Sequence, residues 1–336
     1  MSFRGRRVLV TGADGFIGSH LAEALVRDNA EVTALALYNA FDRYGWLDEV
    51  DPDARSSMTL VRGDIRDGVA MHRLAEGHDV IFHLAALIGI PYSYDSAQSY
   101  IDVNVTGTLN IVAAARDFGT AKVVHTSTSE CYGTAQFVPI TEDHPLVGQS
   151  PYAASKIGAD QIALSFHRSF GVPVTVARPF NTYGPRQSAR AVIPTTITQI
   201  ASGKAEIELG ALSPTRDFNF VQDTVDGLIA ILDAKGTDGE TINLGSGHEI
   251  SIGDLVELIA SVMNKKVTVV SKTERMRPEK SEVERLLADA SKAKRMTGWS
   301  PSLAGREGLR RGLETTAAWF SQPANLARYR VGRYTV

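Results

Sequence analysis

The chain has 336 residues, and its 35 lysines and arginines nearly balance 38 acidic residues, for a formal net charge of −3. This length can bury one large core or two interlocked ones, and the charge excludes a strongly basic nucleic-acid-binding protein. Cys131 is the only cysteine, so neither an intrachain disulfide nor a cysteine-rich metal site can form.

Apolar runs are short throughout the chain. None reaches the roughly 18 residues that a membrane-spanning helix needs. The first apolar run ends at Thr11-Gly12, which is too short for the core of a signal peptide. A single cysteine also fits a reducing compartment. We therefore expect a cytoplasmic protein with no membrane partner.

Short β-branched runs alternate with longer helical patterns in the first half of the chain. The patterns predict strands at 7–11, 32–37, 59–62, 80–84, 122–126 and 172–177, and helices at 16–27, 69–76, 99–118 and 152–170. Strands that are apolar throughout are typical of a parallel sheet covered on both faces. The repeated order of strand and helix predicts an α/β fold with a doubly wound parallel sheet.

After about residue 180 the alternation becomes less regular. A helix at 221–234 and a strand at 241–244 are expected to return to the first sheet, and further helices are predicted at 252–263 and 304–320. We expect a first domain over 1–180 with a return segment at 215–245. A smaller C-terminal α/β domain would comprise 181–214 and 246–336. The arginine-containing tail at 325–336 is expected to be a solvated terminus.

A glycine-rich turn follows the first predicted strand, in the order Thr11-Gly12-Ala13-Asp14-Gly15-Phe16-Ile17-Gly18. Glycines at 12, 15 and 18 permit a tight turn, close approach of a pyrophosphate and close packing of a helix on a strand. The helix that begins here offers free N–H groups and the positive end of its dipole to a phosphate. The turn therefore predicts a dinucleotide site.

The sequence does not select NAD over NADP. An acidic residue usually follows the second strand of such folds and binds the adenosine ribose, but residues 33–38 contain no carboxylate. NADP is therefore not excluded, and Arg43 could meet its 2′-phosphate. Asp64, after the third strand, is a candidate partner of the adenine amino group, and an ordinary strand-end turn residue is the alternative.

Tyr152 and Lys156 begin a predicted helix directly after Pro151. Their i,i+4 spacing places both side chains on one helix face. There the ammonium is expected to lower the pKa of the tyrosine and make the phenolate a usable base. The lysine can also hold a ribose hydroxyl.

Taken together, these motifs resemble the extended short-chain dehydrogenase/reductase family, which implies a Rossmann fold. The matching stretches are Thr11–Gly18, His83–Ala86, Asn104–Thr108, Ser127–Glu130, Tyr152–Lys156, Arg178–Asn181, Arg216–Phe218, Asn243–Gly247 and Arg277–Glu279. Within the family the chain looks most like the nucleotide-sugar 4,6-dehydratases. Residues 87–94, 188–194 and 277–282 resemble the N-acetylglucosamine 4,6-dehydratases of legionaminic-acid-type pathways.

The resemblance implies a permanently held NAD(P), a nucleotide-diphosphate-sugar substrate, a homodimer and no metal. It implies cofactor contacts from Gly12, Gly15, Phe16, Ile17, Gly18, Asp64, Ile65, Leu84, Ala85, Ala86, Tyr152 and Lys156. It implies catalytic roles for Thr128, Ser129, Glu130, Tyr152 and Lys156. It implies substrate contacts from Ser93, Asn181, Arg190, Arg216 and Arg277. The guanidinium groups of these arginines suit a diphosphate.

Glu130 favours a dehydratase over a 4-epimerase. After oxidation at C4, a dehydratase needs a carboxylate to take the C5 proton, whereas a 4-epimerase only turns the keto sugar over. Ser129 stands where dTDP-glucose dehydratases have an aspartic acid, so the proton for the leaving hydroxyl would come from Glu130 or from a water. Cys131 is expected to be a small buried residue and not a nucleophile.

Two other functions remain open. A UDP-glucuronate decarboxylase also carries Thr-Ser-Glu, but such enzymes tend to have an arginine after the catalytic lysine, where this chain has Ile157. A protein that senses dinucleotides without catalysis is the non-enzymatic alternative, and the intact catalytic residues argue against it.

Overall fold

A computed structural model of the chain describes residues 3–330. Its main feature is a seven-stranded sheet in which every neighbouring pair is parallel. In spatial order the strands are β10 (Thr241–Leu244), β6 (Val174–Pro179), β5 (Lys122–Thr126), β4 (Val80–His83), β1 (Arg7–Thr11), β2 (Glu31–Leu37) and β3 (Met58–Gly63). The predicted doubly wound α/β fold is confirmed.

Alternate residues of the central strands contribute to two different cores. Val8 and Val10 of β1 pack in one core with α1 (Phe16–Arg27), α9 (Val221–Asp233) and α11 (Ser291–Thr297). Leu9, between those two valines, packs in the other core. The helices of that second core are α3 (Gly68–Ala75), α6 (Gly107–Phe118) and α7 (Pro151–Phe170). Because both faces are covered, apolar residues predominate on both faces of the central strands.

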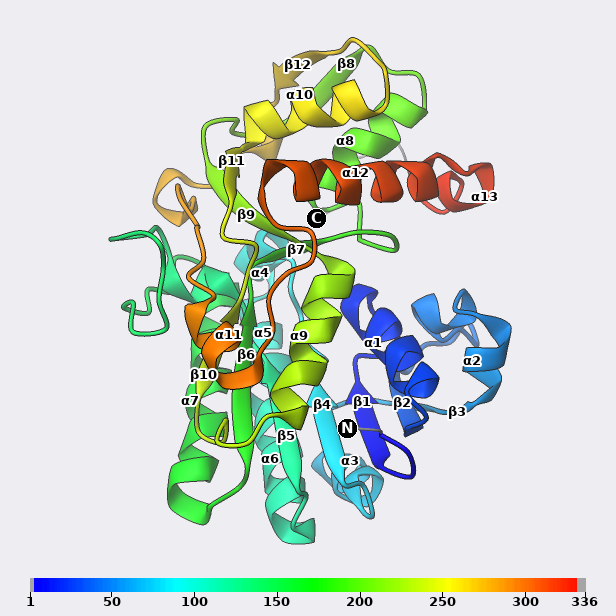
Figure 1. Cartoon of the computed structure of the whole chain (residues 1–336), viewed down its shortest axis with the longest axis vertical. Helices are drawn as coiled ribbons and strands as arrows, with labels where there is room; N and C mark the ends of the chain where they lie inside the picture. Colours follow the sequence, from blue (N-terminus) through cyan, green and yellow to red (C-terminus); the bar gives the residue numbers. More distant parts are fainter. Residues whose placement is uncertain (1–2, 331–336) are drawn as a thin grey trace.

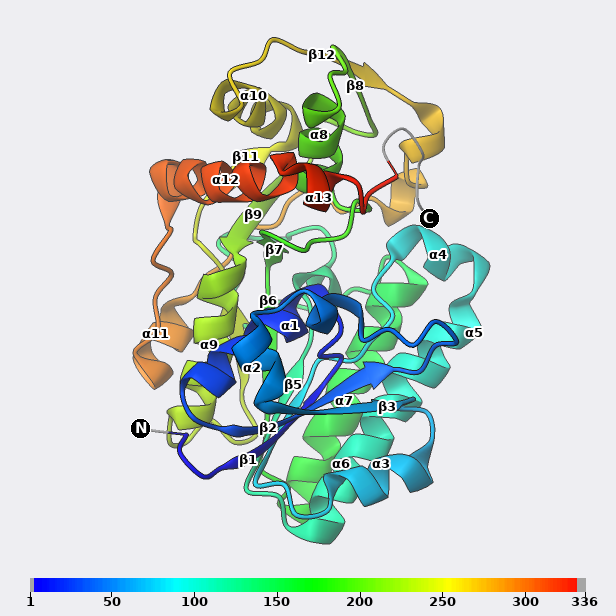
Figure 2. The same ribbon diagram turned by 90° about the vertical axis from the view of Figure 1, so that its right-hand side faces the viewer.

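A second group of elements gathers beyond one end of the seven-stranded sheet (Figures 1 and 2). It contains a three-stranded sheet of β11 (Glu249–Ser251), β9 (Thr215–Phe220) and β7 (Asn181–Tyr183), and a two-stranded sheet of β12 (Thr268–Ser271) and β8 (Glu206–Leu209). Their core is shared with α8 (Val192–Ala201), α10 (Ile252–Val262) and α12 (Gly305–Ser321). The second group thus has an apolar core of its own, separate from the two cores that cover the faces of the first sheet.

One boundary predicted from the sequence needs correction. The expected return to the first sheet over 215–245 begins only at α9, because β9 pairs with β7 and β11 of the second sheet. The strand at 241–244 does return, pairing in parallel with β6. The division of the chain into a cofactor domain and a substrate domain otherwise stays a prediction.

Shorter elements connect these layers. They are α2 (Pro52–Ser56), α4 (Ile90–Asp95), α5 (Ala97–Tyr100), the π-helical turn η2 (Ile101–Thr106), α13 (Pro323–Leu326) and the 3₁₀ turns η1 (Gly45–Asp48), η3 (Ser129–Tyr132), η4 (Thr273–Arg275) and η5 (Glu279–Ser281). Within residues 3–330, no helix is long and apolar enough to span a bilayer, and no group of three or more metal-ligating side chains is found.

Candidate active site

The glycine-rich turn joins β1 to α1 at the carboxyl edge of the first sheet. Gly12 has a left-handed φ of +69°, and a Cβ there would lie 2.7 Å from the backbone nitrogen of Ala85. A Cβ on Gly18 would lie 2.8 Å from the carbonyl carbon of Gly12. Because carbon atoms in contact are normally about 3.5–4 Å apart, only glycine fits at both positions. The turn therefore packs directly against the start of α1 and the end of β4.

The start of α1 has the features of a phosphate site. Gly15 is its N-cap, and no side chain accepts a hydrogen bond from the first turn that carries Phe16 and Ile17. The N–H groups there and the helix dipole favour an anion. Next to the turn, Leu84–Ala86 follow β4, and the Ala85 N–H donates to Thr11 Oγ1 at 3.2 Å. This cradle fits the pyrophosphate of a dinucleotide.

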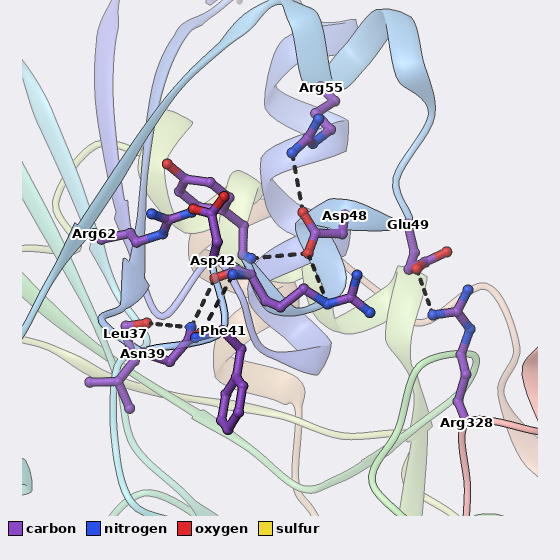
Figure 3. A network of polar contacts seen from close by, with 11 residues as sticks. Leu37, Asn39, Phe41, Asp42, Asp48, Glu49, Arg55, Arg62 and Arg328 are labelled. Carbon is purple, nitrogen blue, oxygen red and sulfur yellow. Dashed lines mark hydrogen bonds and ion pairs between the residues drawn. The ribbon is translucent and has the colours of Figure 1, made fainter.

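The loop after β2 is ordered by side chains of its own (Figure 3). The Asn39 carboxamide oxygen accepts from the backbone N–H groups of Phe41 and Arg43. The Arg43 side chain lies 3.9 Å from the Asp48 carboxylate, which also accepts from Arg55 at 3.1 Å. Arg43, the candidate for a 2′-phosphate, therefore already has a carboxylate partner.

Asp64 and Ile65, at the end of β3, lie in different surroundings. Both Asp64 carboxylate oxygens lie 3.0 Å from Arg66 Nε, and this hydrogen bonding lowers the pKa of Asp64. Ile65 is buried and packs on Gly107 of α6. The ion pair with Arg66, two residues further on, agrees with the alternative that Asp64 is an ordinary strand-end turn residue. The proposed adenine contacts of Asp64 and Ile65 stay predictions.

Tyr152 and Lys156 lie on the first turns of α7. The Ser150 side chain accepts from the Ala153 N–H at 3.1 Å, and Pro151 follows at the first helical position. Such a cap stabilises a helix start by about 1 kcal/mol. Lys156 Nζ donates to the backbone oxygen of Thr126 at 2.8 Å. The helix start therefore holds the buried pair against the carboxyl end of β5.

Burial dominates the ionisation of this pair. It raises the pKa of Tyr152, against the opposing hydrogen bond with Thr128, and the charge of Glu130 raises it further. Burial also lowers the pKa of Lys156. Burial is the largest effect on the pKa of Tyr152, and Lys156 is not among the effects that the structure shows on it, so the lowering expected from Lys156 stays a prediction.

Thr128, Ser129 and Glu130 come directly after β5. Thr128 caps the 3₁₀ turn η3, and its hydroxyl accepts from the Glu130 N–H at 3.2 Å. Ser129 and Glu130 are 2% and 8% exposed. Cys131 lies in the same 3₁₀ turn and is buried, as predicted. Burial raises the pKa of its thiol to about 12, so the thiol is unreactive.

Two arginines from distant segments meet at one carboxylate. Arg216 Nη2 on β9 donates to Glu282 Oε1 at 3.2 Å, and Arg277 Nη1 donates to the same oxygen at 3.4 Å. Burial lowers the pKa of Arg216, and the charge of Glu130 is the first of the effects that oppose this. Glu130, Arg216 and Arg277 therefore belong to one charged cluster.

Glu282 was not recognised from the sequence as part of this site. The available signal was an acidic residue five positions after Arg277. That spacing is too loose to predict a contact in a segment without regular structure.

The remaining residues predicted to bind substrate differ in their burial and in their hydrogen bonds. Ser93 is buried and donates to the Ile90 carbonyl within its own helix at 2.6 Å, so its hydroxyl is already paired. Arg190 is exposed, and its guanidinium lies next to Gly89. The Asn181 carboxamide oxygen is buried with no hydrogen-bond partner among the described residues. A substrate group that donates a hydrogen bond would satisfy Asn181.

Asn104 is a second residue to which sequence reasoning gave no role. It lies in the π-helical turn η2, a local form that is frequent at functional sites. Its oxygen accepts from the Leu87 N–H at 2.8 Å, and its nitrogen donates to Ser155 Oγ at 2.9 Å. Asn104 thus connects the segment after β4 to α7 between Tyr152 and Lys156.

The tail was expected to be a solvated terminus, but it makes contacts with the rest of the chain as far as Tyr329. Arg328 pairs with Glu49 (Figure 3), and the Tyr329 hydroxyl donates to the Gln187 carbonyl at 3.0 Å. The Tyr329 ring packs with Trp46 and Trp319, at centroid distances of 6.3 and 6.4 Å. The tail therefore connects the loop after β2 to α12. Residues 331–336 lie outside the described residues.

Comparison with known proteins identifies the family. Residues 9–312 match the family model described as GDP-mannose 4,6 dehydratase. The chain belongs to this family. Sequence relatives include a UDP-glucuronate 4-epimerase of Thermodesulfobacterium geofontis, 33% identical over 95% of this chain and 98% of the relative.

Other relatives are named for other reactions. A UDP-N-acetyl-alpha-D-glucosaminuronate decarboxylase of Bacillus cytotoxicus is 33% identical over 95% of this chain and 99% of its own. A dTDP-glucose 4,6-dehydratase of Actinoplanes sp. is 33% identical over 94% and 97%. The dTDP-glucose 4,6-dehydratase DesIV of Streptomyces venezuelae, solved as a double mutant with NAD and DAU, has a TM-score of 0.82 and 31% identity over 94% of this chain and 97% of its own. Membership therefore indicates an enzyme that modifies nucleotide sugars, without selecting one reaction.

Proposed function

We propose that the protein is an NAD-dependent nucleotide-sugar 4,6-dehydratase. The observation that carries the proposal is the position of Glu130, a buried carboxylate whose charge acts on both Tyr152 and Arg216. A dehydratase needs a second acid–base group close to the tyrosine, whereas a 4-epimerase does not. NAD is the proposed cofactor because the cradle around Gly12 and Gly18 fits a dinucleotide and related structures hold NAD.

In the proposed reaction, Tyr152 is the base that takes the proton of the sugar 4-hydroxyl, next to the Thr128 hydroxyl, and the positive charge of Lys156 would favour the phenolate that burial disfavours. Bound NAD supplies a hydride acceptor at the first step and the donor at the last, and is unchanged overall. The 4-ketone makes the C5 proton acidic, and the Glu130 carboxylate takes it. The C6 hydroxyl then leaves as water, protonated by the newly neutral Glu130 or by a water molecule, because Ser129 is a poor acid.

The proposed substrate is a nucleotide-linked N-acetylglucosamine. This preference rests on the resemblance of residues 87–94, 188–194 and 277–282 to that branch of the dehydratases. Arg216 and Arg277 would bind the diphosphate, and Asn181 has an unpaired carboxamide oxygen that can accept a hydrogen bond. Arginine forks offer the donors that a diphosphate needs in a partly dry cleft.

Incubation with UDP-, GDP- and dTDP-sugars, with and without heavy water, tests the proposal. The expected product has lost one water, carries deuterium at C5 and has the substrate C4 hydrogen at C6. A product of unchanged mass with no deuterium at C5 would identify an epimerase. Loss of carbon dioxide from a uronic acid would identify a decarboxylase. Bound dinucleotide without turnover of any sugar would support the sensing alternative.

We also propose that the protein is a cytoplasmic homodimer. The helices implied by the resemblance, near 100–118 and 152–170, correspond to η2, α6 and α7. Ile101 and Leu109 on this surface are 44% and 38% exposed. Exposed apolar side chains of this kind suit burial against a second copy.

A further inference from the structure

A fully buried carboxylate lies beneath the catalytic pair, and the proposed mechanism does not use it. Asp160 is on α7, one helical turn beyond Lys156 and two beyond Tyr152, and it is 0% exposed. The three residues therefore share one face of the helix. A charge at such a depth persists only where donors surround it.

The donors come from two neighbouring strands of the first sheet. His125 Nε2 donates to Asp160 Oδ1 at 3.1 Å, and Ser127 Oγ donates to Oδ2 at 2.7 Å. His125 is on β5, and Ser127 lies between the end of β5 and Thr128. Arg178 Nη2, on β6, also donates to Oδ2, at 2.7 Å. One carboxylate thus joins α7, β5 and β6.

Each of these three segments continues into the site. α7 carries Tyr152 and Lys156, β5 leads to Thr128 and Glu130, and β6 leads to Asn181. Arg178 adds a further contact, because its guanidinium carbon lies 4.7 Å from the centre of the Tyr132 ring in η3, the turn that contains Glu130. Movement of Asp160 would therefore change the spacing between the proposed tyrosine base and the proposed carboxylate base.

The stability of the fold is a poor explanation for this arrangement. Asp160 and Arg178 have side-chain exposures of 0% and 3%. Removing two such charges from water costs about as much as their attraction returns, so apolar side chains would serve packing equally well. Hydrogen bonds in three fixed directions do supply something that apolar packing cannot, which is a defined orientation of α7 relative to β5 and β6.

We propose that Asp160 is a positioning residue, which fixes the catalytic face of α7 against the ends of β5 and β6. Its negative charge also offsets the burial of Lys156 and favours the ammonium form of that lysine. This inference rests on the proposed function only in taking Tyr152 and Lys156 as the acid–base pair.

Asp160→Asn tests the proposal, since the amide keeps the shape but loses the charge and replaces one acceptor oxygen with a donor. A misplacement near 1 Å lowers rates by roughly 10²-fold. We expect kcat to fall by about 10- to 100-fold, with KM and bound dinucleotide nearly unchanged and a larger isotope effect from deuterium at the sugar C4. Asp226→Asn is the control for loss of a helical carboxylate outside the site, because Asp226 is exposed on α9 and accepts a side-chain hydrogen bond from Gln222 at 2.8 Å.

Ser127→Ala is the second variant, and it tests the positioning role of Asp160 even if Asp160→Asn does not fold. It removes one donor to Asp160 and leaves the ion pair with Arg178 in place. Ser165→Ala, which removes a hydroxyl that donates to the Ile162 carbonyl on the same helix, is its control. We expect a several-fold loss of kcat and a larger C4 isotope effect for Ser127→Ala alone. A normal kcat and isotope effect in a folded Asp160→Asn or in Ser127→Ala would overturn the proposal.

The readout separates this inference from the proposed function. Formation of reduced dinucleotide after mixing with a nucleotide sugar, followed by near-ultraviolet absorbance in a single turnover, reports C4 oxidation. Dehydratases, 4-epimerases and decarboxylases all begin with that step. Slower C4 oxidation in Asp160→Asn therefore supports the positioning role even if the final product shows that the dehydratase proposal is wrong.

Discussion

Replacement of Gly18 by alanine should remove the bound dinucleotide from the purified protein. The new Cβ would lie 2.8 Å from the Gly12 carbonyl carbon and 2.9 Å from the Ala13 Cα, both of them backbone atoms. These separations are more than about 0.5 Å inside ordinary carbon contact, so α1 and the glycine-rich turn must move apart. Overpacking of this kind costs about 1–3 kcal/mol.

The assay combines extraction of dinucleotide with thermal unfolding. We expect Gly18→Ala to retain little dinucleotide and to have a lower Tm. Gly253→Ala is the matched control, because Gly253 also lies in a helix, α10, and the nearest atom to a Cβ there is 3.8 Å away. Alanine is the better helix former by about 1 kcal/mol, so this control should be as stable as the wild type or more so. Full dinucleotide content in Gly18→Ala would refute the assignment of this turn to the cofactor.

Other changes test other parts of the molecule. Tyr152→Phe should lower turnover by about 10²–10⁴-fold, the usual contribution of a positioned acid–base group, while extracted dinucleotide stays normal; unchanged turnover would contradict its role as base. Burial raises the pKa of Glu23, but the Arg186 ion pair at 2.7 Å, the Asp51 N–H and Arg27 together outweigh this, so the net pKa lies below the usual 4.5. This stabilisation should be complete above pH 4.5 and lost as the pH falls further, so Glu23→Gln should destabilise the protein more at pH 7 than at pH 3.5 in urea unfolding. Leu109→Asp should convert the proposed dimer to a monomer in light scattering, and a persistent dimer would exclude this surface.

The first sheet could be predicted from the sequence because its signals are local. The runs at 7–11, 122–126 and 241–244 are strands with the predicted bounds, and the helix at 16–27 is also confirmed. Apolar runs bounded by turns identify buried parallel strands without knowledge of their neighbours. The glycine turn was visible for the same reason, because its geometry depends on consecutive residues.

The second sheet gave no comparable signal. β9 has the sequence TRDFNF, in which Arg216, Asp217 and Asn219 are buried. The Asp217 carboxylate is satisfied by Ser246 and Gly247, and also by the Ala288 N–H at 3.1 Å. These partners come from segments 29 to 71 residues away, so no window of sequence around β9 can show why its polar side chains are buried.

The residues of the site also divide into those with a local sequence signal and those without one. The spacing of Tyr152 and Lys156 on one helix was readable, but the effect of burial on their pKa values was not, because the burying residues come from other elements. Asp160 carried no signal beyond its place on the helix face. Its importance appears only when β5 and β6 are placed beside α7.

The aromatic contact between the loop after β2 and α12 has an experimental consequence. The chain has three tryptophans, and two of them, Trp46 and Trp319, lie edge to face in this contact at a centroid distance of 5.7 Å. The third, Trp299, is 6% exposed and donates to the Asp223 carbonyl inside the first core. Two of the three tryptophans therefore lie where the segment after β2 meets α12. A ligand that separates or closes these two parts should change the emission of these two residues in the unlabelled protein, which provides an optical signal for binding and for the rate of the accompanying movement.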